Sequence, residues 1–186
     1  MIIIPCGIDC GLADLLKKYN LRHFSLPFDW SVSYGGVSEI IKNDFIDFIP
    51  VNCINSIYSY SFIHNNFPHD TETMTRRCKR LLNLLRNTPD ELVFIRKGHA
   101  VHHHAECNQK GFNLENDITD AEKLSIVLKQ KYPMLKYKII VVLVCGSCFD
   151  NNIVYTSTNI QIYNIATPTV DNNKFEQILN EIISTL

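Results

Sequence analysis

The sequence predicts an α/β fold, a single-domain sandwich with a mostly parallel central sheet flanked by helices. Short apolar runs alternate along the chain with segments of helical periodicity, an order that favours parallel strands. Residues 138–144 form a continuous and largely β-branched apolar run, which is typical of a central strand covered on both faces. The 186 residues contain no internal repeat, low-complexity linker or charge block, so one domain over residues 1–186 is expected.

The first half of the chain opens with a strand and an amphipathic helix. Residues 1–5 are largely apolar, and Gly7 permits a tight turn after them. Apolar side chains then recur with helical spacing from Leu12 to Tyr19. Three weaker elements follow. They are a short strand or buried turn at residues 24–30, a weak helix at 37–48 and an extended segment at 56–63.

The second half of the chain has clearer periodicity. Its expected elements are a helix at residues 71–86, a strand at 91–95, a polar loop at 96–116, a helix at 119–131, the central strand, a strand at 160–165 and a helix at 171–183. Thr119 and Glu122 have the spacing of a capping box, which predicts that the helix at residues 119–131 begins there. Asp171 is the expected N-cap of the last helix.

Composition argues against several classes of protein. A net charge of −1 gives no basic surplus for binding a phosphate backbone, so no nucleic-acid partner is expected. No apolar stretch is long enough to span a bilayer, and the first residues lack the pattern of a signal peptide, so no membrane association is expected. Seven cysteines cannot all pair, which favours free thiols and a cytoplasmic location. The sequence does not indicate an oligomeric state.

Cys10 lies where the first strand gives way to the first helix. Unpaired backbone N–H groups and the positive end of the helix dipole favour a thiolate at such a place. The same N–H groups, with Gly11 among the residues that supply them, suit a developing oxyanion in a bound substrate. Cys10 is therefore a candidate nucleophile. The alternative is a small buried cysteine that packs the strand–helix turn.

The predicted topology gathers reactive side chains at one edge of the sheet. Sites in open α/β sheets form beyond the carboxyl ends of the strands. Four segments are expected there, residues 6–11, 64–70, 96–116 and 145–150, and they contain five of the seven cysteines and six of the seven histidines. This expectation depends on the strands being parallel.

A cysteine nucleophile needs a base and a group that orients the base. His64, directly after an extended segment, is the first candidate base, with a backbone-bonded structural histidine as the alternative. The loop that holds His99 and His103 is a second source of a base, and both side chains are expected to contact substrate. Asp29, in the Pro-Phe-Asp-Trp segment, is the preferred orienter, although aspartate is equally common as a turn residue.

Zinc binding is the competing chemistry. Cys145 and Cys148 have the spacing of half a structural zinc site, and His99, Cys107 and residues 102–104 supply further ligand types. The chain lacks a second such cysteine pair, so no metal and no other cofactor is expected.

The sequence also resembles a known family. The residues that carry the resemblance are Cys6-Gly7-Ile8-Asp9-Cys10-Gly11-Leu12-Ala13, Ser25-Leu26-Pro27-Phe28-Asp29-Trp30, Phe62-Ile63-His64, Arg76-Arg77 and Phe94-Ile95-Arg96. They are similar to papain-like cysteine peptidases from bacteria and large DNA viruses, and the resemblance covers most of the chain up to about Val144. The resemblance implies a nucleophile at Cys10 and a base at His64. The chain departs from the family pattern at Asn65, where members commonly have Asp, and at Pro5-Cys6, where they have Ser-Leu.

Together these observations predict a cysteine-dependent hydrolase, a peptidase, deamidase or acyl-transfer enzyme, that acts on a peptide, isopeptide or amide bond of a protein or peptide substrate. The alternative is a non-catalytic interaction protein, for instance of a virus, that uses the same fold to bind a host partner.

Overall fold

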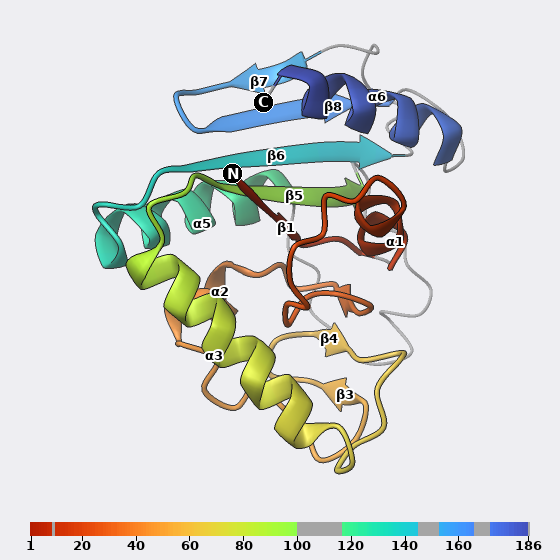
Figure 1. Cartoon of the computed structure of the whole chain (residues 1–186), viewed down its shortest axis with the longest axis vertical. Helices are drawn as coiled ribbons and strands as arrows, with labels where there is room; N and C mark the ends of the chain where they lie inside the picture. Colours follow the sequence, from red (N-terminus) through yellow and green to blue (C-terminus); the bar gives the residue numbers. More distant parts are fainter. Residues whose placement is uncertain (9, 100–116, 145–152, 166–171, 186) are drawn as a thin grey trace.

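A computed structural model describes the chain except for residues 9, 100–116, 145–152, 166–171 and 186 (Figure 1). The elements in chain order are β1 (Ile2–Pro5), α1 (Gly11–Lys18), β2 (Val32–Ser33), α2 (Ser38–Lys42), β3 (Ile54–Asn55), β4 (Tyr60–Ser61), α3 (Thr71–Asn87), β5 (Leu92–His99), α5 (Asp117–Lys131), β6 (Tyr137–Val144), β7 (Ile153–Thr156), β8 (Ile160–Asn164) and α6 (Asn172–Thr185). No described helix is long and apolar enough to cross a membrane.

The central sheet has the strand order β1-β5-β6-β8-β7. β1, β5, β6 and β8 are parallel, and β7 pairs antiparallel with β8 at one edge. β6 lies in the middle, and its side chains alternate between two separate hydrophobic clusters, Ile139 and Val141 on one face and Ile140 and Val142 on the other. This two-residue alternation follows from the pleat of a strand. The predicted α/β class and the mostly parallel sheet are confirmed.

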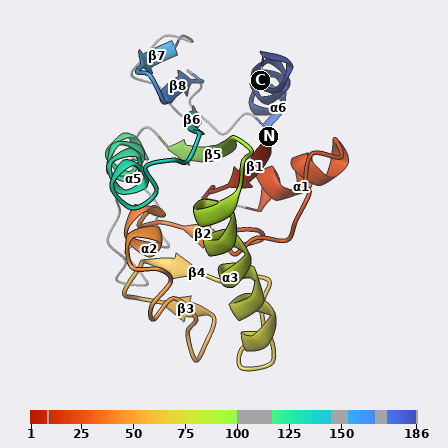
Figure 2. The ribbon, with the colours of Figure 1, turned by 60° about the vertical axis from the view of Figure 1, so that its left-hand side comes forward.

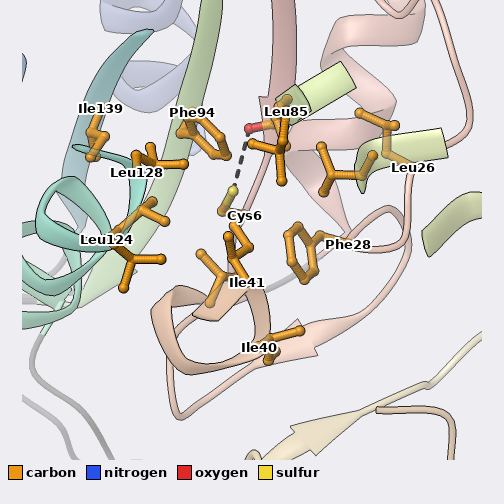
Figure 3. Close-up of a cluster of buried hydrophobic side chains, with 14 of the residues drawn as sticks. Cys6, Leu26, Phe28, Ile40, Ile41, Leu85, Phe94, Leu124, Leu128 and Ile139 are labelled. Atoms are coloured by element: carbon orange, nitrogen blue, oxygen red, sulfur yellow. Dashed lines mark hydrogen bonds between the residues drawn. The ribbon is translucent and has the colours of Figure 1, made fainter. Parts of the chain in front are cut away.

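Helices cover both faces of this sheet (Figure 2). On one face α1 and α6 bury Leu12, Leu16 and Leu179 against the sheet. On the other face α2, α3 and α5 share one cluster with the sheet. Figure 3 shows part of this second cluster, where Phe28 and Ile41 pack close to the Cys6 side chain. The helix patterns of the sequence predicted these buried faces because each helix presents one apolar stripe.

A small antiparallel sheet, with the strand order β2-β4-β3, lies beyond α2 on the second face (Figure 2). Each of its strands has two residues. Aromatic rings pack this small sheet against the core. The ring centroid of Phe48 is 4.9 Å from that of Tyr60 and 5.1 Å from that of Phe62. Such aromatic pairs add stability beyond that of buried area alone.

Four sequence expectations need correction. The strand expected at residues 91–95 continues to His99, because its last four residues pair with β6. Helix α5 begins at Asp117, so Thr119 lies inside it and does not cap it. The extended segment at residues 56–63 forms only the short strand β4. The antiparallel edge strand β7 was not predicted.

Candidate active site

Cys10 occupies the N-cap position of α1, and its side chain is half-buried. The carbonyl of Cys10 accepts the first hydrogen bond of the helix from Asp14 N, at 3.3 Å. Its thiol makes no hydrogen bond to another described residue, and no side chain caps the helix. Cys10 is therefore the residue next to the first turn of a helix, where unpaired backbone N–H groups carry partial positive charge.

The backbone before Cys10 is held in place by the central sheet. Cys6 N donates to Ile95 O at 2.9 Å, and Ile8 N donates to Lys97 O at 3.1 Å, so the chain runs beside β5 after β1 has ended. On its other side, Ser33 Oγ donates to Gly7 O at 2.9 Å. These contacts fix the course of the chain three residues before the nucleophile candidate.

A buried arginine completes this support. Arg96, on β5, donates from Nη1 to Cys6 O at 2.7 Å and to Ser33 Oγ at 2.6 Å. Its Nε forms an ion pair with the buried Asp117 of α5. Burial opposes the charge of Arg96, but the neighbouring Asp117 and Asp120 carboxylates outweigh it and raise the pKa of the guanidinium. Arg96 thus joins β5 to α5, and it also holds the backbone at Cys6, four residues before Cys10.

The Asp120 carboxylate extends the same network to α2. It accepts hydrogen bonds from Val37 N and Ser38 N, both at 3.0 Å, at the start of that helix. Gly36 next to them has a left-handed backbone (φ +80°), and a side chain there would clash with the Asp120 carboxylate. Burial raises the pKa of Asp120, although the Arg96 charge and these hydrogen bonds oppose the rise.

The other described cysteines suit nucleophilic chemistry less well. Cys6 is buried and its Sγ lies 3.5 Å from Ile4 O, as the dashed line in Figure 3 marks. Burial raises the pKa of the Cys6 thiol strongly and that of Cys78 to about 12, so both remain protonated at neutral pH. Cys53 is exposed, and its Sγ donates to Asn65 O at 3.0 Å.

His64 is exposed and follows β4, in the small sheet. The predicted placement of residues 64–70 at the edge of the central sheet is therefore wrong. The imidazole contacts the Trp30 ring edge to face, with centroids 6.2 Å apart and planes at 87°. Among the described residues no hydrogen bond joins it to Cys10. Catalytic hydrogen bonds in unliganded enzymes are often long or unformed, so the role of His64 as base stays a prediction.

Asp29 is fully buried and is engaged by Arg22. Its Oδ2 accepts hydrogen bonds from Arg22 Nε at 2.9 Å, from Arg22 Nη2 and from Leu26 N at 3.1 Å. Burial raises the pKa of Asp29, and the hydrogen bonds from Arg22 oppose that rise. Its Oδ1 is buried and has no partner among the described residues. None of the described hydrogen bonds of Asp29 is to an imidazole, so the role of Asp29 as orienter of the base stays a prediction.

The remaining predicted site residues are only partly described. Gly11 is the first residue of α1, next to the candidate nucleophile. His99 is the last residue of β5, and its backbone pairs with Val144. His103, Cys107, Cys145 and Cys148 lie outside the described residues. Within the described part of the chain no three His, Cys, Asp or Glu side chains form a group that could hold a metal ion.

Sequence reasoning missed the polar side chains that support the site. The sequence contained one indication of a role for Arg96, because it follows an apolar strand within a segment that resembles the family. Its burial was not expected, because residues 96–116 were predicted to form a loop. The sequence contained no such indication for Arg22 beyond its place in the opening segment.

A cleft of about 400 Å³ lies away from Cys10, where α3 and α5 end, and is lined by residues that include Arg86, Lys131 and Met134. It belongs to the opposite edge of the sheet from Cys10, since β5 and β6 begin there.

Comparison with known proteins agrees with the resemblance. A family model described as "Putative papain-like cysteine peptidase (DUF1796)" matches residues 2–74. No curated protein and no solved structure gives a significant match to the chain. The matched segment is less than half of the chain, but it includes Cys10, Asp29 and His64. At a coarse level the match supports a cysteine hydrolase. From β1 to the start of α3, this chain therefore matches the family of papain-like cysteine peptidases, as the sequence motifs up to His64 predicted.

Proposed function

We propose that the protein is a cysteine-dependent hydrolase of peptide, isopeptide or amide bonds, with Cys10 as nucleophile. The observation that carries the proposal is the position of Cys10, a half-exposed thiol at the start of a helix that directly follows a buried strand. Cys6 and Cys78 are buried, and Cys53 lies on a loop without a helix start. Electropositive and partly exposed surroundings are those in which reactive cysteines are found.

The proposed reaction has two stages. In the first, His64 takes the thiol proton and Cys10 Sγ attacks the carbonyl carbon of the substrate. The tetrahedral intermediate collapses when the carbon–nitrogen bond breaks, the amine leaves with the proton from His64, and the acyl group stays on Cys10 as a thioester. In the second stage, His64 deprotonates a water that attacks the thioester. The carbon–sulfur bond then breaks, the acid leaves, and the proton returns to the thiolate.

The first turn of α1 would stabilise the negative oxygen of both tetrahedral intermediates. Backbone N–H groups at a helix start point toward such an oxygen, and removing one oxyanion donor from an enzyme typically costs about 10²–10³ in kcat. A protein or peptide substrate and a reducing, cytoplasmic setting suit this chemistry, because the thiolate must stay free of disulfides.

Alkylation by iodoacetamide tests the proposal without a known substrate. At pH 6.5 we expect Cys10 to react at least about tenfold faster than Cys53, because a neighbouring base and the helix start favour its thiolate. Mass spectrometry of peptides from partly alkylated protein gives both rates in one experiment. His64→Ala should remove most of this advantage and leave the Cys53 rate unchanged.

The exposed His69, five residues further on, provides the matched control, and His69→Ala should change neither rate. Equal rates at Cys10 and Cys53 in the native protein would contradict the assignment of the nucleophile. An advantage of Cys10 that survives His64→Ala would contradict the assignment of the base.

A second candidate function is that of a non-catalytic interaction protein. Exposed apolar side chains around β3 favour it, among them Val51, which is 91% exposed, and Ile57, which is 70% exposed. Exposed apolar residues that gather in one region mark binding surfaces more often than chance would place them. If Cys10 shows no enhanced reactivity, binding of a partner through these exposed apolar side chains becomes the better-supported function.

A further inference from the structure

The Trp30 ring contacts both a cation and the candidate base. The guanidinium carbon of Arg22 is 5.8 Å from the centroid of the Trp30 ring, within the range of a cation–π contact. The His64 ring contacts the same indole edge to face at 6.2 Å. The imidazole is exposed, so among the described residues its ring contact with Trp30 is the one that restricts its orientation.

The Arg22 side chain is itself immobilised by a buried acid. Two of its nitrogens donate to Asp29 Oδ2, and its Nη2 also donates to Ser25 Oγ at 3.0 Å. Asp29 is fully buried, and Leu26 N holds the same carboxylate oxygen. A two-pronged arginine–carboxylate pair fixes direction as well as distance. The geometry of Arg22 is therefore set before it meets the indole.

The backbone of Trp30 supports a dedicated role for its ring. Trp30 has φ +62°, in the left-handed region that bulky side chains rarely adopt. Such conformations cost about 1–3 kcal/mol and persist where the surroundings determine them, often at functional sites. Here the conformation directs the indole from a buried turn toward both Arg22 and His64.

We infer that Arg22 and Trp30 are positioning residues for His64, and that Asp29 acts on the imidazole through them. This inference rests on the proposed function, in which His64 is the base for Cys10. A buried carboxylate fixes the guanidinium, the guanidinium fixes the indole, and the indole limits the rotation of the imidazole. Asp29 thereby performs the orienting task without touching the histidine.

Intrinsic fluorescence tests the stack independently of any reaction. Trp30 is the single tryptophan of the chain, so indole emission comes from this residue. A protonated imidazole quenches an adjacent indole, and imidazole side chains gain a proton as the pH is lowered. We expect the indole emission of the native protein to fall in a step on acidification and this step to disappear in His64→Gln. The control His23→Gln, next to Arg22 in the sequence, should retain the step.

The alkylation rate of Cys10 tests the positioning role. Trp30→Gly removes the ring and also relieves the left-handed backbone, so the fold is preserved as far as possible. We expect Trp30→Gly to slow iodoacetamide alkylation of Cys10 at pH 6.5 at least about fivefold, with no change at Cys53. Trp30→Phe should recover most of the rate, because it restores a ring. Arg22→Met should slow the reaction of Cys10 in the same direction as Trp30→Gly.

The outcomes separate this inference from the function on which it rests. If His64→Ala slows Cys10 but Trp30→Gly does not, the positioning role is wrong and the base assignment stands. Loss of the fluorescence step in His23→Gln, or its survival in His64→Gln, overturns the stack itself. If His64→Ala leaves Cys10 unaffected, the proposed function fails, and the positioning role is overturned with it even where the fluorescence step is seen.

Discussion

At the scale of single residues, Arg96 connects three separate parts of the chain to β5. It joins β5 to the Cys6 carbonyl, to Ser33 of β2 and to Asp117 of α5. Gly98, two residues along the strand, makes room for this arrangement, because a side chain there would clash with the Asp117 carboxylate. Buried ion pairs of this kind fix geometry even where their net contribution to stability is small.

Loss of Arg96 should destabilise the protein strongly. We expect Arg96→Met to lower the free energy of unfolding by about 3–5 kcal/mol, because it breaks the buried ion pair with Asp117 and removes the hydrogen bonds to Cys6 O and Ser33 Oγ. Urea denaturation followed by circular dichroism measures the change. Arg86→Met is the control, since Arg86 is exposed and its pair with Asp44 spans 3.8 Å, and it should cost no more than about 1 kcal/mol. A loss below 1 kcal/mol for Arg96→Met would contradict the role of Arg96 in holding the site.

At the scale of elements, Asp44 links the segment after α2 to α5. Lys131 Nζ donates to its Oδ1 at 2.8 Å, and Tyr132 OH donates to the same oxygen at 3.3 Å. Partial burial opposes ionisation, but the Lys131 hydrogen bond and charge prevail and hold the pKa of Asp44 below its usual range. Asp44 also has a left-handed backbone (φ +51°), which aspartate and asparagine tolerate better than most residues.

This contact should make stability depend on pH. Because the folded-state pKa of Asp44 is lowered, its contribution is present above its unfolded pKa of about 3.9 and is lost as the pH falls through the folded value. Asp44→Asn keeps the backbone preference and removes the charge. We expect it to cost about 0.5–1 kcal/mol at pH 7, since the pair is partly exposed, and to cost less at pH 3. Urea denaturation at both pH values checks this, and an equal cost at the two would be evidence against the ion pair.

At the scale of the whole molecule, the central sheet unites two hydrophobic clusters. Successive residues of β1, β5 and β6 enter opposite clusters, for example Ile3 and Ile4 of β1. The small sheet shares its aromatic residues with the cluster on the side of α2 and α3. Because β1, β5 and β6 contribute side chains to both clusters, loss of either cluster would expose one face of the same strands. We therefore expect the chain to unfold as one cooperative unit.

Two probes of unfolding test this expectation of a single domain. Trp30 emission reports on the segment between α1 and β2, whereas far-ultraviolet circular dichroism reports mainly on the helices. Their urea transitions should coincide in midpoint and slope, as a two-state reaction requires. Loss of the Trp30 signal at clearly lower urea than the helical signal would indicate that the small sheet is a separate unit.

Local patterns in the sequence were sufficient for the parallel strands of the central sheet and for the long helices. A continuous apolar run indicates a strand buried on both faces, and apolar side chains at helical spacing indicate a helix with one buried face. The antiparallel edge strand β7 gave no such pattern. The small sheet could not be predicted in the same way, since strands of two residues are too short to show alternation. The start of α5 was missed because the buried pair between Asp117 and Arg96 sets it, and a local capping pattern at Thr119 does not reveal that tertiary contact.

The candidate site was predictable to a similar extent. Cys10 was found because its place between a strand and a helix is a local property of the chain. The environment of Asp29 was not, because its partner Arg22 has the same sequence appearance as any exposed arginine. The sequence also did not reveal that Asp29 and Trp30 both contact Arg22, because a cation–π contact leaves no local pattern in the sequence.

The position of β1 bears on how this chain can be divided. Among the described strands, β1 lies at the end of the sheet and pairs with β5, which begins eighteen residues after the last residue of the family match. A fragment of residues 2–74 would lack the strand that pairs with β1. It would also lack Arg96, whose guanidinium donates a hydrogen bond to Cys6 O. The end of the family match is therefore not a boundary of independent folding, and the backbone that leads to Cys10 is held in part by residues beyond that match.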